Sequence, residues 1–275
     1  MSDKTMNYWT QSKDNIFVAA HRGWSERYPE NTMPAFIAAL EIGVDQLETD
    51  VHITKDGQLV LIHDRTVDRT TNGSGFVREY TLEQLRQLDA GSWKGQQFTG
   101  TKIPTFIELM ELVKDHPTLT LDVELKDYPE DVEELAFQVC DQVLKIIDDY
   151  GFTDRIVLNT WSSRLNEYIF TKYGKKYRQH VYWPASVMKS ECRIDPYSYA
   201  YCVCLFGKAG VPGNRGMGTK EECAEMITRG CRPWAPASVK NEELVDAVID
   251  AEYELITCNN PDHILDLLRK KNKHK

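Results

Sequence analysis

The chain has 275 residues, 41% of them hydrophobic, which is enough to bury a large core either as one α/β barrel or as two small domains. Its formal net charge of −9 argues against broad electrostatic binding to nucleic acid or to an anionic membrane surface, since both need a basic face. No run approaches the roughly 18 apolar residues of a membrane-spanning helix, and the start lacks the apolar segment of a secretory signal. We therefore expect a cytoplasmic protein without a nucleic-acid partner or a transmembrane segment.

Strand-like and helix-like runs alternate along the chain, which is typical of a parallel sheet with crossover helices. The expected strands are 16–20, 44–51, 59–63, 119–125, 155–160, 179–183, 201–206, 231–235 and 253–257. The expected helices are 34–42, 105–114, 129–149, 163–173, 220–229, 241–251 and 261–271. About eight βα units over roughly 250 residues is the size of a closed barrel, and no Pro-, Gly- or Ser-rich linker divides the chain. The sequence predicts an α/β fold, a (β/α)₈ TIM barrel, as a single domain over residues 1–275.

Two connections are too long or too irregular for ordinary loops. Residues 64–103, rich in Thr, Gly, Asp and Arg, predict an active-site insertion after the second strand region. Residues 207–218 carry five glycines but lack the Lys-Ser/Thr ending of a phosphate-cradling loop, so they predict a loop over the barrel mouth rather than a nucleotide site. The seven cysteines are odd in number and lack close Cys-x-x-Cys pairs, which indicates reduced thiols.

Two histidines each close a short apolar run. His21 follows residues 16–20, and His63 follows residues 59–62. Active sites in such barrels lie where the strands end, so both side chains are expected at the barrel mouth. Imidazole gains and loses a proton near neutral pH, and the pair therefore predicts acid–base chemistry.

Carboxylates alternate with apolar residues in two of the expected strands. Glu48 and Asp50 share one strand face, and Glu124 and Lys126 repeat the pattern in the strand that follows the insertion. Carboxylates that face into a poorly solvated mouth repel one another unless a cation lies between them. Oxygen ligands favour Mg²⁺ or Ca²⁺ over zinc. The alternative is a metal-free network in which Arg22 and Lys126 neutralise the acids.

A dense series of motifs carries a resemblance to a known family. The motifs are His21-Arg22-Gly23, Pro29-Glu30-Asn31-Thr32, Glu48-Thr49-Asp50-Val51, Thr54-Lys55-Asp56-Gly57, His63-Asp64, Thr70-Thr71-Asn72-Gly73-Ser74-Gly75, Ile103-Pro104-Thr105 and Glu124-Leu125-Lys126. This series resembles the glycerophosphodiester phosphodiesterase family over residues 16–126, and the likeness returns near Trp234 and at 256–257. The resemblance implies a TIM barrel that hydrolyses a small glycerophosphodiester to glycerol 3-phosphate and an alcohol.

The resemblance also implies the roles of individual residues. Glu48, Asp50 and Glu124 would hold the metal, and His21 and His63 would be the acid–base pair. Arg22 and Lys126 would contact the phosphate. Arginine offers a planar fork of donors and lysine a compact charge, so the chemistry of both side chains agrees with that role.

Three further positions have more than one interpretation, and a fourth departs from the family pattern. Glu30 would touch the metal or the substrate, or hold Arg22, or cap the first helix. Asp64 would orient His63 or order the insertion rather than bind metal, and Trp234 would form a wall of the glycerol site or fill the barrel core. Cys258 stands where the family usually has an aspartate.

Other activities compete with this one. A phospholipase of D or C type could act on lysophospholipids or phosphoinositides from the same barrel. Some aromatic residues of the rim loops could receive an alcohol group or a lipid tail, but hydrophobic filling under the long loops is the default interpretation. These aromatic residues are Trp24, Tyr28, Trp93, Phe98, Trp161, Tyr182 and Trp183. A non-catalytic metal- and phosphate-binding barrel is disfavoured because no key histidine or carboxylate is missing. The nucleophile, water or the glycerol 2-hydroxyl, stays open, as does the assignment of acid and base.

Overall fold

The computed structural model describes residues 15–206 and 216–275. Within that part of the chain, eight parallel strands close into a barrel in the order β1-β9-β8-β7-β6-β5-β4-β2, and β1 pairs with β2 to complete the ring. The barrel strands are β1 Phe17–His21, β2 Gln46–Ile53, β4 Thr120–Leu125, β5 Ile156–Asn159, β6 Arg178–Trp183, β7 Cys202–Leu205, β8 Arg232–Ala235 and β9 Leu255–Cys258. The predicted TIM barrel is confirmed, and its extension as one domain over residues 1–275 stays a prediction.

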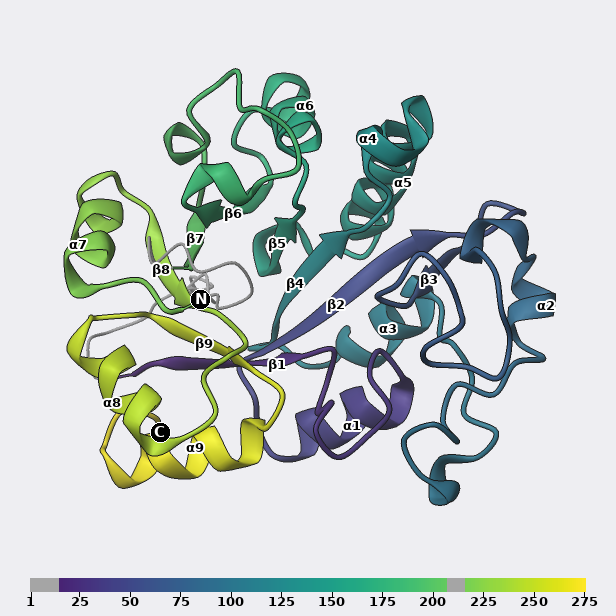
Figure 1. The fold of residues 1–275 in the computed structure, drawn as a ribbon, viewed down its shortest axis with the longest axis horizontal. Helices are drawn as coiled ribbons and strands as arrows, with labels where there is room; N and C mark the ends of the chain where they lie inside the picture. The colour runs from purple at the N-terminus through teal and green to yellow at the C-terminus, as the bar shows by residue number, and fades with distance from the viewer. Residues whose placement is uncertain (1–14, 207–215) are drawn as a thin grey trace, which may run out of the picture.

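Helices surround the barrel strands on the outside (Figure 1). Their bounds are α1 Met33–Glu41, α2 Leu82–Leu85, α3 Phe106–Val113, α4 Pro129–Val132, α5 Glu134–Asp149, α6 Ser163–Tyr173, α7 Lys220–Thr228, α8 Glu242–Asp250 and α9 Pro261–Lys270. Thr105 begins α3 with a capping box, its hydroxyl accepting from the Glu108 N–H. The single helix predicted over 129–149 is wrong in one respect. Glu133 adopts a positive φ of 49°, which ends α4 and begins α5.

The expected strand 59–63 forms differently from the other predicted strands. It is β3, Leu59–Leu61, and it pairs antiparallel with β2, so that Leu61 lies opposite Val51. Only residues 54–58 separate the two strands, which is too short for the crossover that a parallel neighbour needs. β3 is therefore the returning arm of a hairpin beyond the barrel wall. Its return brings His63 back toward the mouth, because the Ile62 N–H donates to the Asp50 carbonyl at 3.2 Å.

The insertion 64–103 lies beside β3 (Figure 1). It shares a small apolar core with β3 and with the residue that follows β3. That core consists of Val60, Ile62, Val67, Val77, Leu85, Ala90 and Ile103. Two contacts fasten the insertion to the loop after β1. The Lys94 ammonium donates to the Ser25 carbonyl at 2.7 Å, and the rings of Tyr28 and Phe98 lie 5.5 Å apart. The insertion is thus packed on the loop that follows His21.

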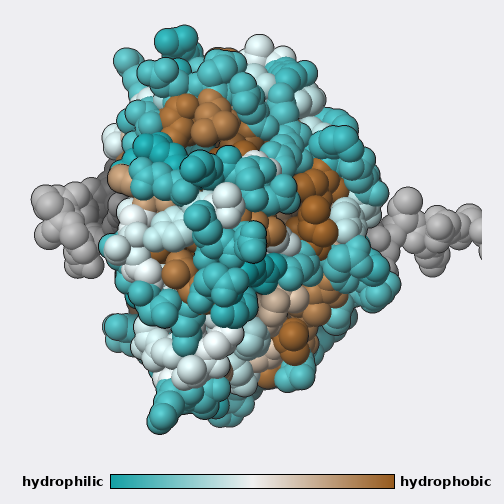
Figure 2. Space-filling model, turned by 90° about the vertical axis from the view of Figure 1, so that its right-hand side faces the viewer, coloured by the Kyte–Doolittle hydropathy of each residue, from teal (hydrophilic) through white to brown (hydrophobic). Residues whose placement is uncertain are grey.

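The outer surface is mainly hydrophilic on the side of α2 and β3, where hydrophobic residues form separate patches (Figure 2). No helix in the described ranges is long and apolar enough to cross a membrane. The cytoplasmic location stays a prediction. Most of the glycine-rich segment 207–218 falls on residues 207–215, which lie outside the described residues.

Candidate active site

A cavity of about 610 Å³ opens at the carboxyl ends of the barrel strands. This is the end of a TIM barrel where active sites lie. The lining side chains come from every barrel strand or the loop after it, and from the end of the β2–β3 hairpin. They are His21, Arg22, Glu48, His63, Asp122, Glu124, Lys126, Tyr128, Asn159, Trp161, His180, Tyr182, Val187, Lys189, Cys204, Phe206, Pro236, Ala237, Ser238 and Thr257.

The strand register brings the predicted metal ligands together. β1, β2 and β4 are neighbours, with His21 opposite Glu48 and with Asp50 opposite Glu124. One ligand oxygen from each of Glu48, Asp50 and Glu124 lies within 4.8 Å of the others, and all three residues are buried. Two positions on β2 and one on its neighbour thus form a compact carboxylate triad.

Two cationic side chains reach into this carboxylate triad. The Lys126 ammonium lies 2.6 Å from Glu124 Oε1 and 3.1 Å from Asp50 Oδ1. Arg22 Nε lies 3.2 Å from Asp50 Oδ2, and the Arg22 backbone N–H donates to Glu48 Oε2 at 2.8 Å. Asp50 is therefore paired with a cation on both sides, while the hydrogen bond that Glu48 accepts within the described ranges comes from a backbone N–H.

With all three triad carboxylates ionised, the charges of the site do not balance without a further cation. Arg22 and Lys126 are shared among three buried carboxylates, and Arg22 also pairs with Glu30 at 2.9 Å. Burial and the nearby Asp50 raise the pKa of Glu48 well above its ordinary value. Burial alone would also raise the pKa of Asp50, but Lys126 and Arg22 outweigh it and lower that pKa. Three hard oxygen donors with unbalanced negative charge fit a divalent cation such as Mg²⁺ or Ca²⁺.

The sharp turn after β1 presents Arg22 to the site. Arg22 has a positive φ of 58°, uncommon for a side chain of its size, and Gly23 follows with a φ of 75°. A Cβ at Gly23 would lie 2.7 Å from the carbonyl carbon of Ala35, so only glycine fits here. The hydrogen bond from the Arg22 backbone N–H to the Glu48 carboxylate holds this turn next to the carboxylate triad.

His21 has an amide partner. Its Nδ1 lies 2.7 Å from Oδ1 of Asn259, an oxygen that also accepts from the Ser25 hydroxyl at 3.1 Å. An amide oxygen only accepts, so Nδ1 carries the proton and Nε2 keeps its lone pair. That Nε2 lies 3.9 Å from Glu48 Oε2. Burial, then the charge of Arg22, lowers the pKa of His21 to about 4, which keeps the imidazole neutral at pH 7.

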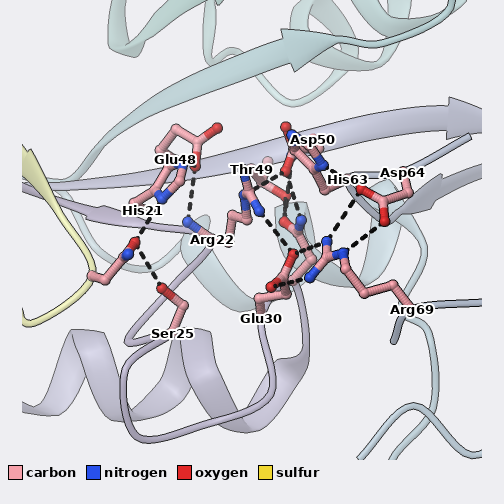
Figure 3. A network of polar contacts seen from close by, with 12 residues as sticks. His21, Arg22, Ser25, Glu30, Glu48, Thr49, Asp50, His63, Asp64 and Arg69 are labelled. Atoms are coloured by element: carbon pink, nitrogen blue, oxygen red, sulfur yellow. Dashed lines mark hydrogen bonds and ion pairs between the residues drawn. The ribbon is translucent and has the colours of Figure 1, made fainter. Parts of the chain in front are cut away.

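His63 has a carboxylate partner instead. Its Nδ1 lies 2.6 Å from Oδ1 of Asp64, and Asp64 is held in turn by Arg69. Figure 3 shows His21 beside Glu48 and His63 beside Asp50, so the two histidines flank the carboxylate triad. Two of the positions with more than one interpretation contact site residues: Glu30 pairs with Arg22, and Asp64 contacts His63. These contacts match the alternatives in which Glu30 holds Arg22 and Asp64 orients His63.

Several polar residues of the site carried no signal in the sequence. Asn259, Arg69 and Asn159 belong to no pattern that marks a site residue, and His180 lies in a strand that shows no charged alternation. His180 Nδ1 lies 2.8 Å from Asp122 Oδ2, and both residues are buried. Cys258, where the resemblance led us to expect an aspartate, is buried with its thiol 3.8 Å from the Ala19 carbonyl. The next residue, Asn259, is the one that contacts His21.

Aromatic side chains form the opposite wall of the cavity. Trp161 and Tyr182 stack with ring centroids 3.9 Å apart, and Phe206 is nearly parallel to both, 5.7 Å from each. The Tyr182 hydroxyl donates to Asn159 Oδ1 at 2.6 Å, which fixes the ring. The cavity therefore has a charged half over β1, β2 and β4 and an aromatic half over β5 to β7.

Trp234 is not part of that wall. It is fully buried inside the barrel in an apolar cluster with Ala19, Val157, Cys202 and Leu255, and its ring meets His180 edge-on at 5.2 Å. It does not line the cavity. The structure therefore corresponds to the core alternative for Trp234 rather than to the predicted substrate contact.

The sequence matches known proteins over most of its length. Residues 21–191 match the model of the glycerophosphoryl diester phosphodiesterase family. The chain belongs to this family. The matched range holds His21, the three triad carboxylates, His63 and the insertion, so the residues described above are those of a glycerophosphoryl diester phosphodiesterase family member.

Relatives of the family cover nearly the whole chain. A glycerophosphodiester phosphodiesterase of Caldanaerobacter subterraneus is 35% identical over 92% of this chain and 98% of its own. A glycerophosphodiester phosphodiesterase of Bacillus altitudinis is 43% identical over 91% of this chain and 97% of its own. A phosphodiesterase structure from Oleispira antarctica, in complex with the product sn-glycerol-3-phosphate, has the same fold, with a TM-score of 0.72 at 22% identity over 92% of this chain and 96% of that one. The predicted family and enzyme class are confirmed.

Proposed function

We propose that this protein hydrolyses glycerophosphodiesters to glycerol 3-phosphate and an alcohol, with a divalent cation and with two histidines as general acid and base. The observation that carries the proposal is the placement of His21 and His63 on either side of a buried carboxylate triad in one cavity. The names of the relatives, and the product in the Oleispira antarctica structure, supply the substrate class.

The carboxylate triad is the proposed metal site. Glu48, Asp50 and Glu124 would hold Mg²⁺ or Ca²⁺, which when bound polarises a phosphoryl group and offsets charge in the transition state. Arg22 and Lys126 lie at the edge of the triad and would contact the remaining phosphate oxygens. The planar guanidinium can offer paired donors, and the ammonium adds a compact charge.

The partners of the two histidines support a proposal for which is the base and which is the acid. His21 is held by an amide oxygen that fixes its tautomer and leaves Nε2 able to take a proton, so His21 is the base that activates the nucleophile. His63 is held by the Asp64 carboxylate, which stabilises an imidazolium, so His63 is the acid that protonates the departing alkoxide. Each role contributes about 10²–10⁴-fold to the rate of such reactions.

The aromatic half of the cavity is the proposed place of the alcohol group. Trp161, Tyr182 and Phe206 offer an apolar surface across the cavity from the charged half. That wall also favours a second candidate function, a phospholipase D-like action on lysophospholipids. A comparison of turnover on glycerophosphocholine and on lysophosphatidylcholine separates the two, since the first proposal expects the smaller diester to be preferred.

The roles of the histidines can be separated with leaving groups. His63→Ala should lose about 10²–10⁴-fold in kcat on glycerophosphoethanolamine and regain most of it on the diester of p-nitrophenol, which departs without a proton. His21→Ala should lose activity on both substrates, and calorimetry should show Mg²⁺ or Ca²⁺ binding retained in both variants. His263→Ala, on the exposed face of α9, is the matched control. Near-normal turnover of both site variants contradicts the proposal.

A further inference from the structure

We propose that Arg69 is a positioning residue that fixes the side chains of His63 and Arg22 relative to each other. Arg69 lies in the insertion, outside the residues to which the family resemblance assigns a role. The inference rests on the proposed function, because it gives His63 and Arg22 the acid and phosphate-binding roles described above. It adds a residue that would touch neither the substrate nor the metal.

The guanidinium of Arg69 bridges two carboxylates with paired contacts. On one side, Nη1 donates to Glu30 Oε2 at 2.9 Å and Nη2 to Glu30 Oε1 at 2.7 Å. On the other side, Nε donates to Asp64 Oδ2 at 2.6 Å and Nη2 to Asp64 Oδ1 at 3.2 Å. Glu30 lies on the loop after β1 and Asp64 at the start of the insertion, so Arg69 joins two separate segments (Figure 3).

Both carboxylates continue to a residue of the active site. Glu30 Oε1 accepts from Arg22 Nη1 at 2.9 Å, and Asp64 Oδ1 lies 2.6 Å from His63 Nδ1. The result is a row of paired side chains in which cations and anions alternate from Arg22 to Asp64 and which ends at His63; its members are Arg22, Glu30, Arg69, Asp64 and His63. A shift of Arg69 would therefore move the proposed phosphate contact and the proposed acid together.

The charges of Glu30, Asp64 and Arg69 persist at neutral pH. Burial would raise the pKa of Glu30, but the hydrogen bonds and charges of Arg69 and Arg22 lower it. The pKa of Asp64 falls to about 2, because Arg69 and His63 outweigh the effect of its burial. Hydrogen bonds to Glu30 and Asp64 raise the pKa of Arg69 further.

His63 depends on this row because of where it lies in the fold. It follows β3, a hairpin arm outside the barrel wall, whereas His21 ends a barrel strand. Within residues 15–206 and 216–275, Arg69 is the one arginine or lysine that pairs with Asp64. A lysine would replace it only in part, because an ammonium keeps the charge but lacks the planar fork that satisfies two carboxylates at once.

The test compares Arg69→Met and Arg69→Lys with Arg78→Met. Arg78 is an exposed arginine of the same insertion that stacks on Phe76 and has no place in the row, so it is a matched control. We expect kcat on glycerophosphoethanolamine to fall about 10- to 100-fold in Arg69→Met, in keeping with a small misplacement of a reacting group, with KM changed less than about threefold. Arg69→Lys should recover part of the loss, and Arg78→Met should keep the activity of the wild type.

Two further measurements separate positioning from a general loss of structure. Asp64→Asn combined with Arg69→Met should be no slower than the slower single variant, since both changes break the same row. Proton NMR in water should show the hydrogen-bonded Nδ1 proton of His63, identified by its loss in His63→Ala, broadened in Arg69→Met and unchanged in Arg78→Met. The NMR signal does not depend on turnover, so it tests the positioning role of Arg69 even if the wild type hydrolyses no glycerophosphodiester. Such a lack of hydrolysis would refute the proposed function but not the positioning role. An unchanged His63 signal, or a wild-type kcat in Arg69→Met, overturns the inference.

Discussion

Lys126→Met removes the ammonium that bridges two of the triad carboxylates and keeps the apolar stem. In the structure that ammonium lies 2.6 Å from Glu124 and 3.1 Å from Asp50, and the side chain is 7% exposed. Removal of one partner from a buried ion network costs about 3–5 kcal/mol, because the remaining charges lose their compensation. At about 2 °C per kcal/mol for a chain of this size, Tm in chelator should fall by about 6 to 10 °C.

A divalent cation should reverse most of that loss. With the ammonium gone, Asp50 keeps Arg22 as a partner but Glu124 loses its cation, and Mg²⁺ or Ca²⁺ bound at the triad would restore the missing charge. A cation at about 100 times its Kd contributes about 2.7 kcal/mol. Tm of Lys126→Met should then rise by about 5 °C, while kcat/KM stays low because the phosphate contact is lost.

The assay is thermal unfolding followed by fluorescence, first in EDTA and then with the cation added in excess. Lys145→Met removes an exposed lysine of α5 that pairs with Asp149, and should change Tm little under either condition. If Lys126→Met is as stable as the wild type in EDTA, the ammonium does not compensate the triad. If the cation leaves Tm of the variant unchanged, the triad does not bind it, and the metal assignment is wrong.

Three further outcomes are expected. Trp161→Ala should lower kcat/KM about tenfold for a glycerophosphodiester with an apolar alcohol, because the stacked aromatic wall chiefly binds apolar groups. The kcat/KM for glycerophosphoethanolamine should fall less, and equal losses on both substrates would contradict the alcohol subsite. Gly23→Ala should destabilise the protein by more than about 1 kcal/mol in urea and reduce activity, since φ is 75° and the added Cβ meets Ala35; wild-type behaviour would refute the account of the turn. Asp64→Asn should be less stable than the wild type at pH 7, and the difference in free energy of unfolding should shrink as pH falls from about 4 to about 2. The folded-state pKa of Asp64 is depressed, so its carboxylate stabilises the fold above its ordinary pKa, and this stabilisation is lost as pH falls through the depressed pKa. A gap that persists at pH 2 would mean that the Asp64 charge is not its source.

The fold and the carboxylate triad could be predicted because both are local patterns. Alternation with a period of two put Glu48 and Asp50 on one strand face, and the same alternation marked Glu124. The barrel register then places Asp50 opposite Glu124 without further information. His21 was predictable for the same reason, since it ends an apolar strand.

The rest of the site depends on contacts between distant segments. Asn259 lies 238 residues from His21 along the chain, and no local pattern links them. Arg69 is one of several arginines in the charged insertion, and only the folded chain shows that it, rather than Arg78, bridges two carboxylates. Trp234 is a residue type often found in the wall of a substrate site, but its position on β8 places its side chain in the barrel core.

The most direct test of the account is the product formed by the wild-type enzyme from glycerophosphoethanolamine. After treatment with a chelator, Mg²⁺ and Ca²⁺ are added back separately and the phosphorus NMR spectrum is followed in time. The account predicts that glycerol 3-phosphate appears, that the chelator stops its formation, and that at least one of the two cations restores it. Release of phosphoethanolamine, or turnover that the chelator leaves unchanged, would contradict the proposed bond cleavage or the proposed metal dependence.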